Sequence, residues 1–301
     1  MLKDGIGEGS EFSGYHPWVN LTYYILAIGI TMFSLSPWFL AATFVSSWLY
    51  SVLLRGRGVI KMNLIFSFWT LVIMAGINVL FTHNGATVFF YIRGNGVTLE
   101  ALIYGVSAAV MLISVIIWFV SFNVIMSADK LIFIFGKAAP VLGLTMSMIF
   151  RYVPLLKDRF QEIRMGQACL GRSSGKGFIG KMRQFGKEAS ILVSWSLESS
   201  IESADSMEAR GYGLRGRTSF HLYKFTRRDT VLLLLMIILG AIVVAGCALG
   251  KTTVWFYPVY VLGNFDLMTA VTLAAYVLLL FLPIIIDISG EVRWKRSSLE
   301  M

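Results

Sequence analysis

Six apolar stretches alternate along the chain with polar segments, and several of them are long enough to cross a membrane. Stretches of about 18 or more apolar residues with few charges are typical of transmembrane helices. The first stretch is short, and only Ser34–Pro37 separates it from the second, which favours a tight helical hairpin. The pattern therefore predicts an all-α, polytopic membrane protein with about six transmembrane helices. The predicted spans are Leu21–Phe33, Trp38–Leu54, Met62–Phe81, Leu102–Phe122, Val231–Leu249 and Met268–Ile286.

A long polar segment, Phe150–Arg228, interrupts this pattern and has the periodicity of two amphipathic helices. Apolar residues at three- or four-residue steps mark the first helix: Ile149, Val153, Leu156, Phe160, Ile163 and Leu170. The second is expected from about Gly180 to Arg210, with an apolar stripe of Val193, Leu197, Ile201 and Ala204 and an acidic stripe of Glu198, Glu202 and Asp205. This spacing gives each helix one face to bury against the membrane or the other helix, and another face for a partner.

Glycine and proline mark the limits of these two helices. Pro154 lies near the start of the first helix and should bend or begin it. The cluster Gly171–Gly177 ends that helix, and Gly211 and Gly213 end the second. Together with the spans, these limits predict an N-terminal membrane part at 1–123 with about four spans, a cytoplasmic helical region at 124–228, and a C-terminal membrane part at 229–301 with about two spans and a tail.

The distribution of basic residues predicts the orientation in the membrane. Only Arg93 and Lys251 fall in the predicted external loops, and the other basic residues lie in the two tails, in Arg55–Lys61 and in Lys130–Arg228. An excess of Lys and Arg is typical of cytoplasmic loops. We therefore expect a multi-pass protein of the cell membrane with both termini cytoplasmic. The net charge of +9 then describes the face beside the lipid bilayer rather than a nucleic-acid-binding surface.

One further apolar stretch, Leu131–Phe150, could be taken for a span, but Lys137 and Pro140 interrupt it. If it crossed the membrane, the many basic residues between Arg151 and Arg228 would lie outside, against the positive-inside rule. We interpret it as a helix at the cytoplasmic membrane surface that leads into the polar segment. The short apolar piece Val254–Leu262 leaves re-entrant and interfacial placements both open.

The end of the second polar helix, at Arg210 and Gly211, has two explanations. A cation near the negative end of a helix followed by glycine is ordinary capping chemistry. Alternatively, Arg210 projects from a rigid helix end into an acidic pocket of a partner, for which the planar guanidinium fork is well suited. The local pattern alone leaves both explanations open.

Two sequence runs in this segment resemble a known family. Ser203–Tyr212 resembles the Ala-Met-Glu-Ala-Arg-Gly-Tyr motif of the transmembrane (T) component of energy-coupling factor (ECF) transporters, a family shared with CbiQ-type cobalt-transport permeases; Ser206 replaces the first Ala. Arg151–Leu156 resembles the Arg-Phe-x-Pro-Leu-Leu run that opens a coupling helix in that family, with Arg151 and Pro154 at the expected bend. His16-Pro17 resembles the Asp-Pro that commonly precedes the first span.

The first of the family's two arginine motifs departs from the pattern in this chain. The family carries two Ala-Arg-Gly motifs about forty residues apart, each ending a coupling helix. One matches Ala209, Arg210 and Gly211, whereas the other falls on Leu170, Gly171 and Arg172, with leucine at the arginine position. Either Arg172 serves in its place, displaced by two residues, or this motif has lost its arginine.

The resemblance implies a transport function that depends on partners. Two cytoplasmic ABC-type ATPase subunits would bind the arginine-tipped helices. ATP hydrolysis would then be coupled to uptake of a vitamin, a precursor or a metal ion bound by a small membrane protein, the S component. Two other classes stay open: a stand-alone secondary transporter, and a membrane scaffold or enzyme that recruits an unrelated cytoplasmic partner. The predicted spans contain no central charged residue, which a secondary transporter would normally show.

Catalytic chemistry has little support in the sequence. His16, His83 and His221 are scattered without the spacing of metal ligands. Ala245–Thr252 matches a loose P-loop pattern, yet it closes an apolar span and lacks the preceding strand that a phosphate-binding loop requires. We therefore expect no enzyme activity, no catalytic residue, no metal and no cofactor in this chain, with ATP hydrolysis left to the partner subunits.

Overall fold

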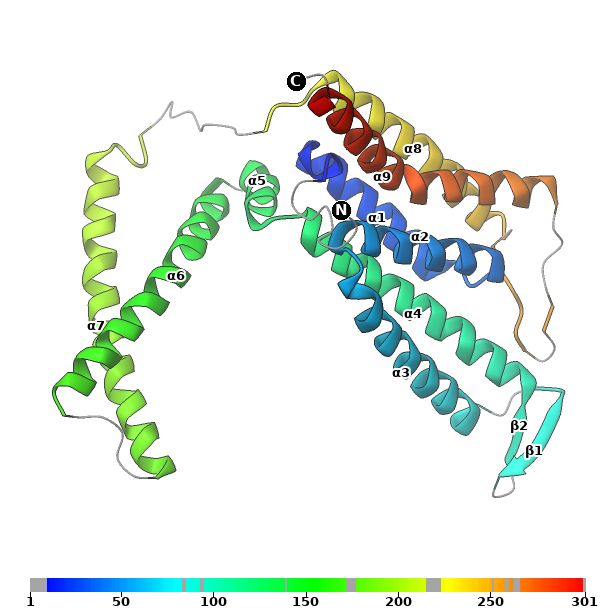
Figure 1. Cartoon of the computed structure of the whole chain (residues 1–301), viewed down its shortest axis with the longest axis horizontal. Helices are drawn as coiled ribbons and strands as arrows, with labels where there is room; N and C mark the ends of the chain where they lie inside the picture. Colours follow the sequence, from blue (N-terminus) through cyan, green and yellow to red (C-terminus); the bar gives the residue numbers. More distant parts are fainter. Residues whose placement is uncertain are drawn as a thin grey trace. The chain divides into compact units, whose positions relative to one another are not determined.

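The computed structural model describes residues 10–82, 85–92, 95–138, 140–171, 177–214, 223–250, 252–257, 260–261 and 266–299. The chain divides into two compact units. One comprises Met1–Lys130 and Tyr223–Met301 and is called the bundle unit below. The other, Leu131–Leu222, is called the arm unit. Each unit is described by itself (Figure 1).

Six long helices form the bundle unit: α1 (Pro17–Phe33), α2 (Pro37–Arg55), α3 (Gly58–Phe81), α4 (Leu99–Ile125), α8 (Arg227–Ala248) and α9 (Leu267–Leu299). Among the described residues, five of them are long and apolar enough to cross a membrane. The remaining helix, α1, is apolar but has only 17 residues. The prediction of an all-α, polytopic membrane protein is therefore confirmed; five of the six predicted spans are long enough to cross, and the first is shorter, as its sequence indicated.

Two small extended features at one end of the bundle unit were not predicted from the sequence. Val88–Ile92 (β1) and Asn95–Thr98 (β2) form an antiparallel hairpin between α3 and α4. In the second feature, Trp255 and Val261 form an isolated antiparallel bridge, and the buried Phe256 stacks edge-on against Tyr104 of α4 with ring centroids 5.2 Å apart. The apolar piece predicted at 254–262 is thus extended, in its described residues, and packs on the bundle.

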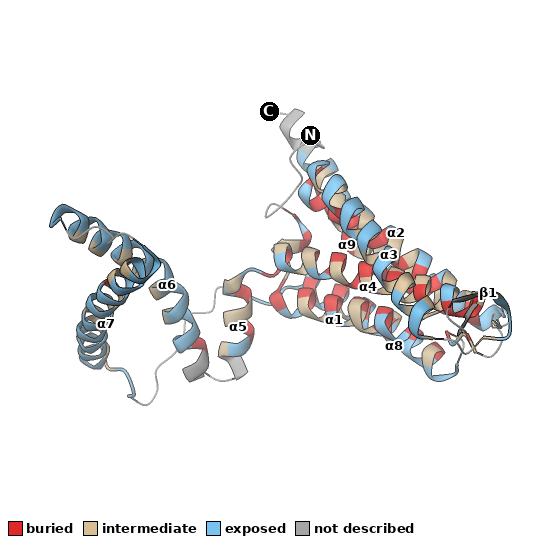
Figure 2. Ribbon diagram, turned by 90° about the horizontal axis from the view of Figure 1, so that it is seen from below, coloured by how far each residue is buried: buried red, intermediate tan, exposed pale blue. Residues whose placement is uncertain are grey.

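Aromatic side chains fill the core of the bundle unit. Tyr23 and Tyr24 of α1 pack edge-on against Trp118 of α4, which also contacts Tyr50 of α2. All four are almost completely buried. A polar contact also joins α1, α2 and α9, because the hydroxyls of Thr31, Thr43 and Tyr276 lie within 3.0 Å of one another. Figure 2 shows buried positions recurring along the helices of the bundle unit.

Helix α3 lies at the periphery of the bundle: more than half of its residues are exposed, and Asn63 is the one that is buried. It packs on α4 at a point where Gly105 lets the backbone approach, since a Cβ there would lie 3.1 Å from the Cα of Ala75. The Asn63 amide donates a hydrogen bond to Ser51 of α2 over 3.0 Å. An apolar exposed surface of this kind suits a helix that faces lipid.

The arm unit contains most of α5 (Ala128–Ala138), and α6 (Pro140–Cys169) and α7 (Phe178–Ala209). The single surface helix predicted over 131–150 is therefore wrong, because the chain forms α5 and then starts α6 at Pro140. Proline suits the first position of a helix, where its missing N–H costs nothing. The two helices approach closely at Gly136 and Gly143, where a Cβ on Gly143 would overlap the Gly136 backbone.

Because α6 starts at Pro140, Pro154 lies in the interior of this helix. We predicted that this proline would bend or begin the first polar helix, but α6 runs from Pro140 through Pro154 without interruption. Pro154 does not begin the helix. An interior proline leaves the carbonyl four residues earlier, on Phe150, without its helical donor. A bend at this point stays a prediction.

Candidate functional site: the two long helices of the arm unit

Helices α6 and α7 pack in antiparallel directions, so that two of the sequence runs singled out above lie side by side. The Tyr152 and Ser203 hydroxyls lie 2.7 Å apart, and Ser203 opens the run that ends at Tyr212. Further along, the Arg159 guanidinium lies over the Trp195 ring, 5.0 Å from its centroid. Tyr152 directly follows Arg151, so the two runs come together where α6 and α7 lie against each other (Figure 1).

A third contact completes the seam between the two helices. The Phe160 and Phe185 rings pack edge to face, with an interplanar angle of 63° and centroids 5.7 Å apart. Edge-to-face aromatic pairs and cation–π contacts each contribute about 0.5–1.5 kcal/mol at partly exposed sites. The seam therefore holds α6 and α7 as a pair through a few specific contacts rather than a broad apolar core.

The C-terminal end of α7 forms a Schellman cap at the predicted coupling motif. Gly211 has a φ of 78°, in the left-handed region that favours glycine. Its N–H donates to the carbonyl of Glu208 over 2.8 Å, and the Tyr212 N–H donates to Met207 over 3.0 Å. These are the two bonds that define the motif. Arg210 is the last residue before the reversal, at the C-cap, and it is exposed.

The end of α6 shares the left-handed glycine and the first of these two hydrogen bonds, with a different side chain before the glycine. Gly171 has a φ of 74°, and its N–H donates to the Ala168 carbonyl over 3.0 Å. Leu170 directly precedes it and is 68% exposed. Leu170 thus occupies, at the end of α6, the position that Arg210 occupies at the end of α7. Arg172, the other candidate for the first motif, lies outside the described residues.

Two exposed arginines of this region, Arg151 and Arg210, take part in no ion pair among the described residues. Over the described residues, the structure contains a single ion pair, between Arg159 and Glu162, with both side chains about half exposed. Arg151 and Arg210 are both exposed. Within that part of the chain, therefore, no carboxylate neutralises the guanidinium at the tip of α7. An acidic surface on another protein would find a charged, preorganised donor there.

The apolar stripe of α7 is also uncovered. Val193, Leu197 and Ile201 are 57%, 63% and 64% exposed, because α6 packs on a different face that carries Phe185, Trp195 and Ser203. The acidic stripe, Glu198, Glu202 and Asp205, is exposed as well. Figure 2 shows the outer surface of α6 and α7 as largely exposed. Exposed apolar surface of this extent marks a contact site for another protein or for a membrane.

Sequence reasoning missed the residues that join the helices. Tyr152, Trp195 and Ser203 carry the seam, yet the apolar periodicity named none of them, since two of the three contacts involve a polar group. The available signal was positional. Tyr152 lies inside the Arg151–Leu156 run, and Ser203 is the first residue of the second run.

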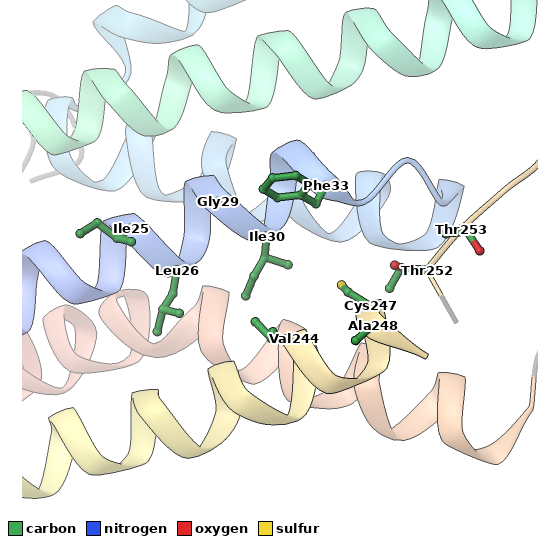
Figure 3. Close-up of a pocket in the computed structure, with 10 residues that line it drawn as sticks. All are labelled: Ile25, Leu26, Gly29, Ile30, Phe33, Val244, Cys247, Ala248, Thr252 and Thr253. Carbon is green, nitrogen blue, oxygen red and sulfur yellow. The ribbon is translucent and has the colours of Figure 1, made fainter. Parts of the chain in front are cut away.

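A separate apolar cavity of about 490 Å³ opens in the bundle unit between α1 and α8. Its lining comprises Ile25, Leu26, Gly29, Ile30, Phe33, Val244, Cys247, Ala248, Thr252 and Thr253 (Figure 3). The lining carries no charged side chain and only two hydroxyls. It is therefore unsuited to an ion or a polar solute.

Comparison with known proteins gives one family match. A family model described as "Cobalt transport protein" (CbiQ) matches residues 13–222. That range contains the first four bundle helices, the whole of α6 and α7, and both glycine-capped helix ends.

Individual relatives match a smaller part of the chain. The energy-coupling factor transporter transmembrane protein EcfT of Streptococcus equi subsp. equi (strain 4047) is 33% identical over 108 residues, which is 35% of this chain and 40% of that protein. The EcfT protein of Streptococcus thermophilus (strain ATCC BAA-250 / LMG 18311) is 33% identical over 111 residues, covering 36% and 42%. The alignments thus span less than half the length of these relatives.

Proposed function

Because the chain belongs to the CbiQ family of cobalt transport proteins, we propose that it is the T component of an energy-coupling factor importer. In this role it couples ATP hydrolysis by two cytoplasmic ABC-type ATPase subunits to the uptake of a small solute. A separate small membrane protein, the S component, binds the solute, which is a vitamin, a precursor or a metal ion. The chain itself performs no catalysis.

The observation that carries this proposal is the matched pair of helix ends in the arm unit. Arg210 and Leu170 each precede a left-handed glycine at the tip of a long helix, and the seam at Tyr152 and Ser203 holds the two helices together. Packed helices move as rigid bodies rather than bending continuously. A push applied at either tip is therefore transmitted along the pair.

Each surface of the arm unit has a partner in this proposal. The guanidinium of Arg210 binds an acidic groove on one ATPase subunit. The Leu170–Gly171 end contacts the second ATPase subunit through apolar surface, unless Arg172 supplies the missing charge. The exposed stripe at Val193, Leu197 and Ile201 receives the S component. Pro154, inside α6, provides the point at which that helix adjusts its direction.

The proposal places the chain in the cell membrane with the arm unit and both termini in the cytoplasm. Three observations support it: five apolar helices long enough to span, an arm unit without such a span among its described residues, and the excess of basic residues between Lys130 and Arg228.

Purification of the tagged full chain from its native membrane tests the proposal. We expect two ABC-type ATPases and one small membrane protein to co-purify. Arg210→Ala should lower ATPase retention about tenfold or more, because charge-assisted hydrogen bonds are worth about 1.5–3 kcal/mol. Arg183→Ala, at an exposed arginine on the same helix, is the matched control and should retain the ATPases. Solute uptake by the purified chain alone would overturn the proposal in favour of a secondary transporter.

A further inference from the structure

Four charged side chains among the described residues of the bundle unit are almost fully buried; Glu100 bonds to Thr87, and the other three contact one short segment. Lys130 is 5% exposed, Asp229 4% and Asp287 2%. Buried charges are rare unless they are paired or hydrogen-bonded, and inside membrane helices they generally mark function. The segment they share is Ser10–His16, which precedes α1 and is called the N-terminal latch below.

Asp287 of α9 fixes the beginning of the latch. Its carboxylate accepts hydrogen bonds from the Ser10 hydroxyl, at 2.9 and 3.0 Å, and from the Phe12 N–H at 2.8 Å. The Phe12 ring is fully buried and packs edge-on against Tyr23 of α1, with centroids 5.4 Å apart. Nearby, Gly290 leaves room for the Glu11 side chain, because a Cβ there would overlap it. Asp287 therefore serves the latch and is not left free as a proton relay.

Lys130 holds the middle of the latch. Its ammonium donates to the Ser13 carbonyl at 2.6 Å, to the Ser13 hydroxyl at 2.9 Å and to the Ile125 carbonyl at 2.8 Å. The Ser13 N–H in turn donates to the Ser10 hydroxyl over 3.2 Å. A continuous hydrogen-bonded chain thus joins the cation of Lys130 to the anion of Asp287 through Ser13 and Ser10.

Asp229 at the start of α8 holds the end of the latch. One of its carboxylate oxygens accepts from the His16 N–H over 3.1 Å. The other accepts from the N–H and hydroxyl of Thr226, at 2.8 and 2.7 Å. The Asp229 N–H donates back to the Thr226 hydroxyl oxygen over 3.5 Å, which completes a capping box. The His16 ring lies against Phe225, with centroids 4.7 Å apart. The latch therefore contacts the last residues before α8 as well as α8 itself.

These contacts fall where the chain leaves and re-enters the bundle unit. Lys130 is the last residue before the arm unit, and Tyr223 is the first after it. Both connections meet the latch: the His16 ring lies edge-on to Tyr223 with centroids 6.5 Å apart, and Lys130 bonds to Ser13. Figure 1 shows the start of α1, the end of α4, the start of α8 and the end of α9 at one end of the bundle.

We propose that the N-terminal latch fixes both connections to the arm unit as one hydrogen-bonded assembly, with Ser10, Lys130 and Asp229 as positioning residues. The proposal rests on the proposed function, since it gives the arm helices a firm base against which ATPase movement acts. A latch that held only one connection would let the other absorb the movement. The contacts at Lys130 and Asp229 secure both.

Hydrogen exchange of the full chain in lipid nanodiscs tests the latch without any partner. Ser10→Ala is the informative variant, because the hydrogen bonds described for Ser10 lead to Asp287 and Ser13 and none of them reaches either connection. We expect amide exchange to become about tenfold faster at both 125–132 and 223–230, because opening the assembly frees both connections. Lys130→Met should do the same, and Lys61→Met, at an exposed lysine of α3, should leave both unchanged.

The outcomes separate the latch from ordinary packing of the N-terminus. Faster exchange confined to 10–14 and 284–290 after Ser10→Ala would overturn the latch, since only the direct neighbours of Ser10 would then respond. ATPase retention gives the second readout: Ser10→Ala should keep the ATPases and Arg210→Ala should lose them. Loss of the ATPases from Ser10→Ala would assign the segment to partner binding and reject its positioning role. Retention by Arg210→Ala would reject the proposed function, whereas the exchange result would stand by itself.

Discussion

Leu170 and Arg210 occupy equivalent positions at the ends of α6 and α7, each immediately before a glycine in the left-handed conformation. At both tips the glycine N–H donates to the carbonyl three residues earlier, and the side chain before the glycine differs. One tip is therefore charged and the other apolar. This asymmetry matters for the proposed function, because two different ATPase surfaces, or one surface used twice, would have to accept the two tips.

Leu170→Arg should restore a second charged tip. Because the cap geometry is already present, we expect the new guanidinium to reach an acidic groove as Arg210 does, and to slow ATPase dissociation from the purified complex about tenfold. Surface-captured complex washed in buffer gives the dissociation rate. Faster dissociation in Leu170→Arg would show instead that this tip binds an apolar surface. Arg172→Ala in parallel decides the other alternative, since a loss of ATPases there would assign the coupling charge to Arg172.

The left-handed cap itself should be sensitive to any Cβ. Gly211→Ala places an L-residue at a φ of 78° and brings its Cβ to 2.9 Å from Leu214, so the last turn of α7 should lose about 1–2 kcal/mol. Gly186→Ala, in the interior of the same helix with open space around it, should instead gain about 0.5–1 kcal/mol. Hydrogen exchange of α7 measures both. Equal effects of the two changes would contradict the cap assignment.

The seam between α6 and α7 should show measurable coupling between Tyr152 and Ser203. Removing either hydroxyl breaks a 2.7 Å hydrogen bond, and a double-mutant cycle of Tyr152→Phe and Ser203→Ala should give a coupling of about 0.5–1.5 kcal/mol. Exchange of amides in both helices provides the free energies. Ser200→Ala is the control, because the Ser200 hydroxyl donates to the Ser196 carbonyl within α7. The coupling energy between Ser200→Ala and Tyr152→Phe should be too small to measure.

Local sequence patterns were sufficient for the helices but not for the contacts between them. Apolar length predicted the spans, and the glycine at 211 predicted the end of α7, because both signals lie within a few neighbouring residues. The hairpin at 88–98 was missed, since a short strand pair carries a weaker pattern than a span. The start of α6 was missed because an apolar run does not reveal that a proline opens a new helix.

The latch shows most clearly what a single sequence leaves out. Ser10 and Asp287 are separated by 277 positions, and Lys130 meets Ser13 across 117. No periodicity relates residues so far apart. The predicted last span ended at Ile286, one residue before the buried carboxylate, so Asp287 was taken as outside the span. Asp287 is buried because the N-terminal latch packs on α9 and hydrogen-bonds to this carboxylate through Ser10 and Phe12.

The stability of the fold should depend on pH because of Lys130 in the latch. Burial lowers the pKa of Lys130 from its ordinary value of 10.5 to about 8. At a pH between about 8 and 10.5, Lys130 is protonated in the unfolded chain and deprotonated in the folded chain. Stability contributed by this group should therefore rise with pH from about 8 to about 10.5, and be constant below that window.

Thermal unfolding of the full chain in detergent from pH 7 to pH 10 measures this effect. The midpoint of the wild type, taken relative to that of Lys130→Met, should increase as the pH passes through 8, because the methionine variant has no proton to release at this position. Lys61→Met removes an exposed lysine of α3 and should leave the pH dependence of the wild type unchanged. A wild-type midpoint that stays at a fixed offset from Lys130→Met across this range would show that the Lys130 ammonium keeps its ordinary pKa.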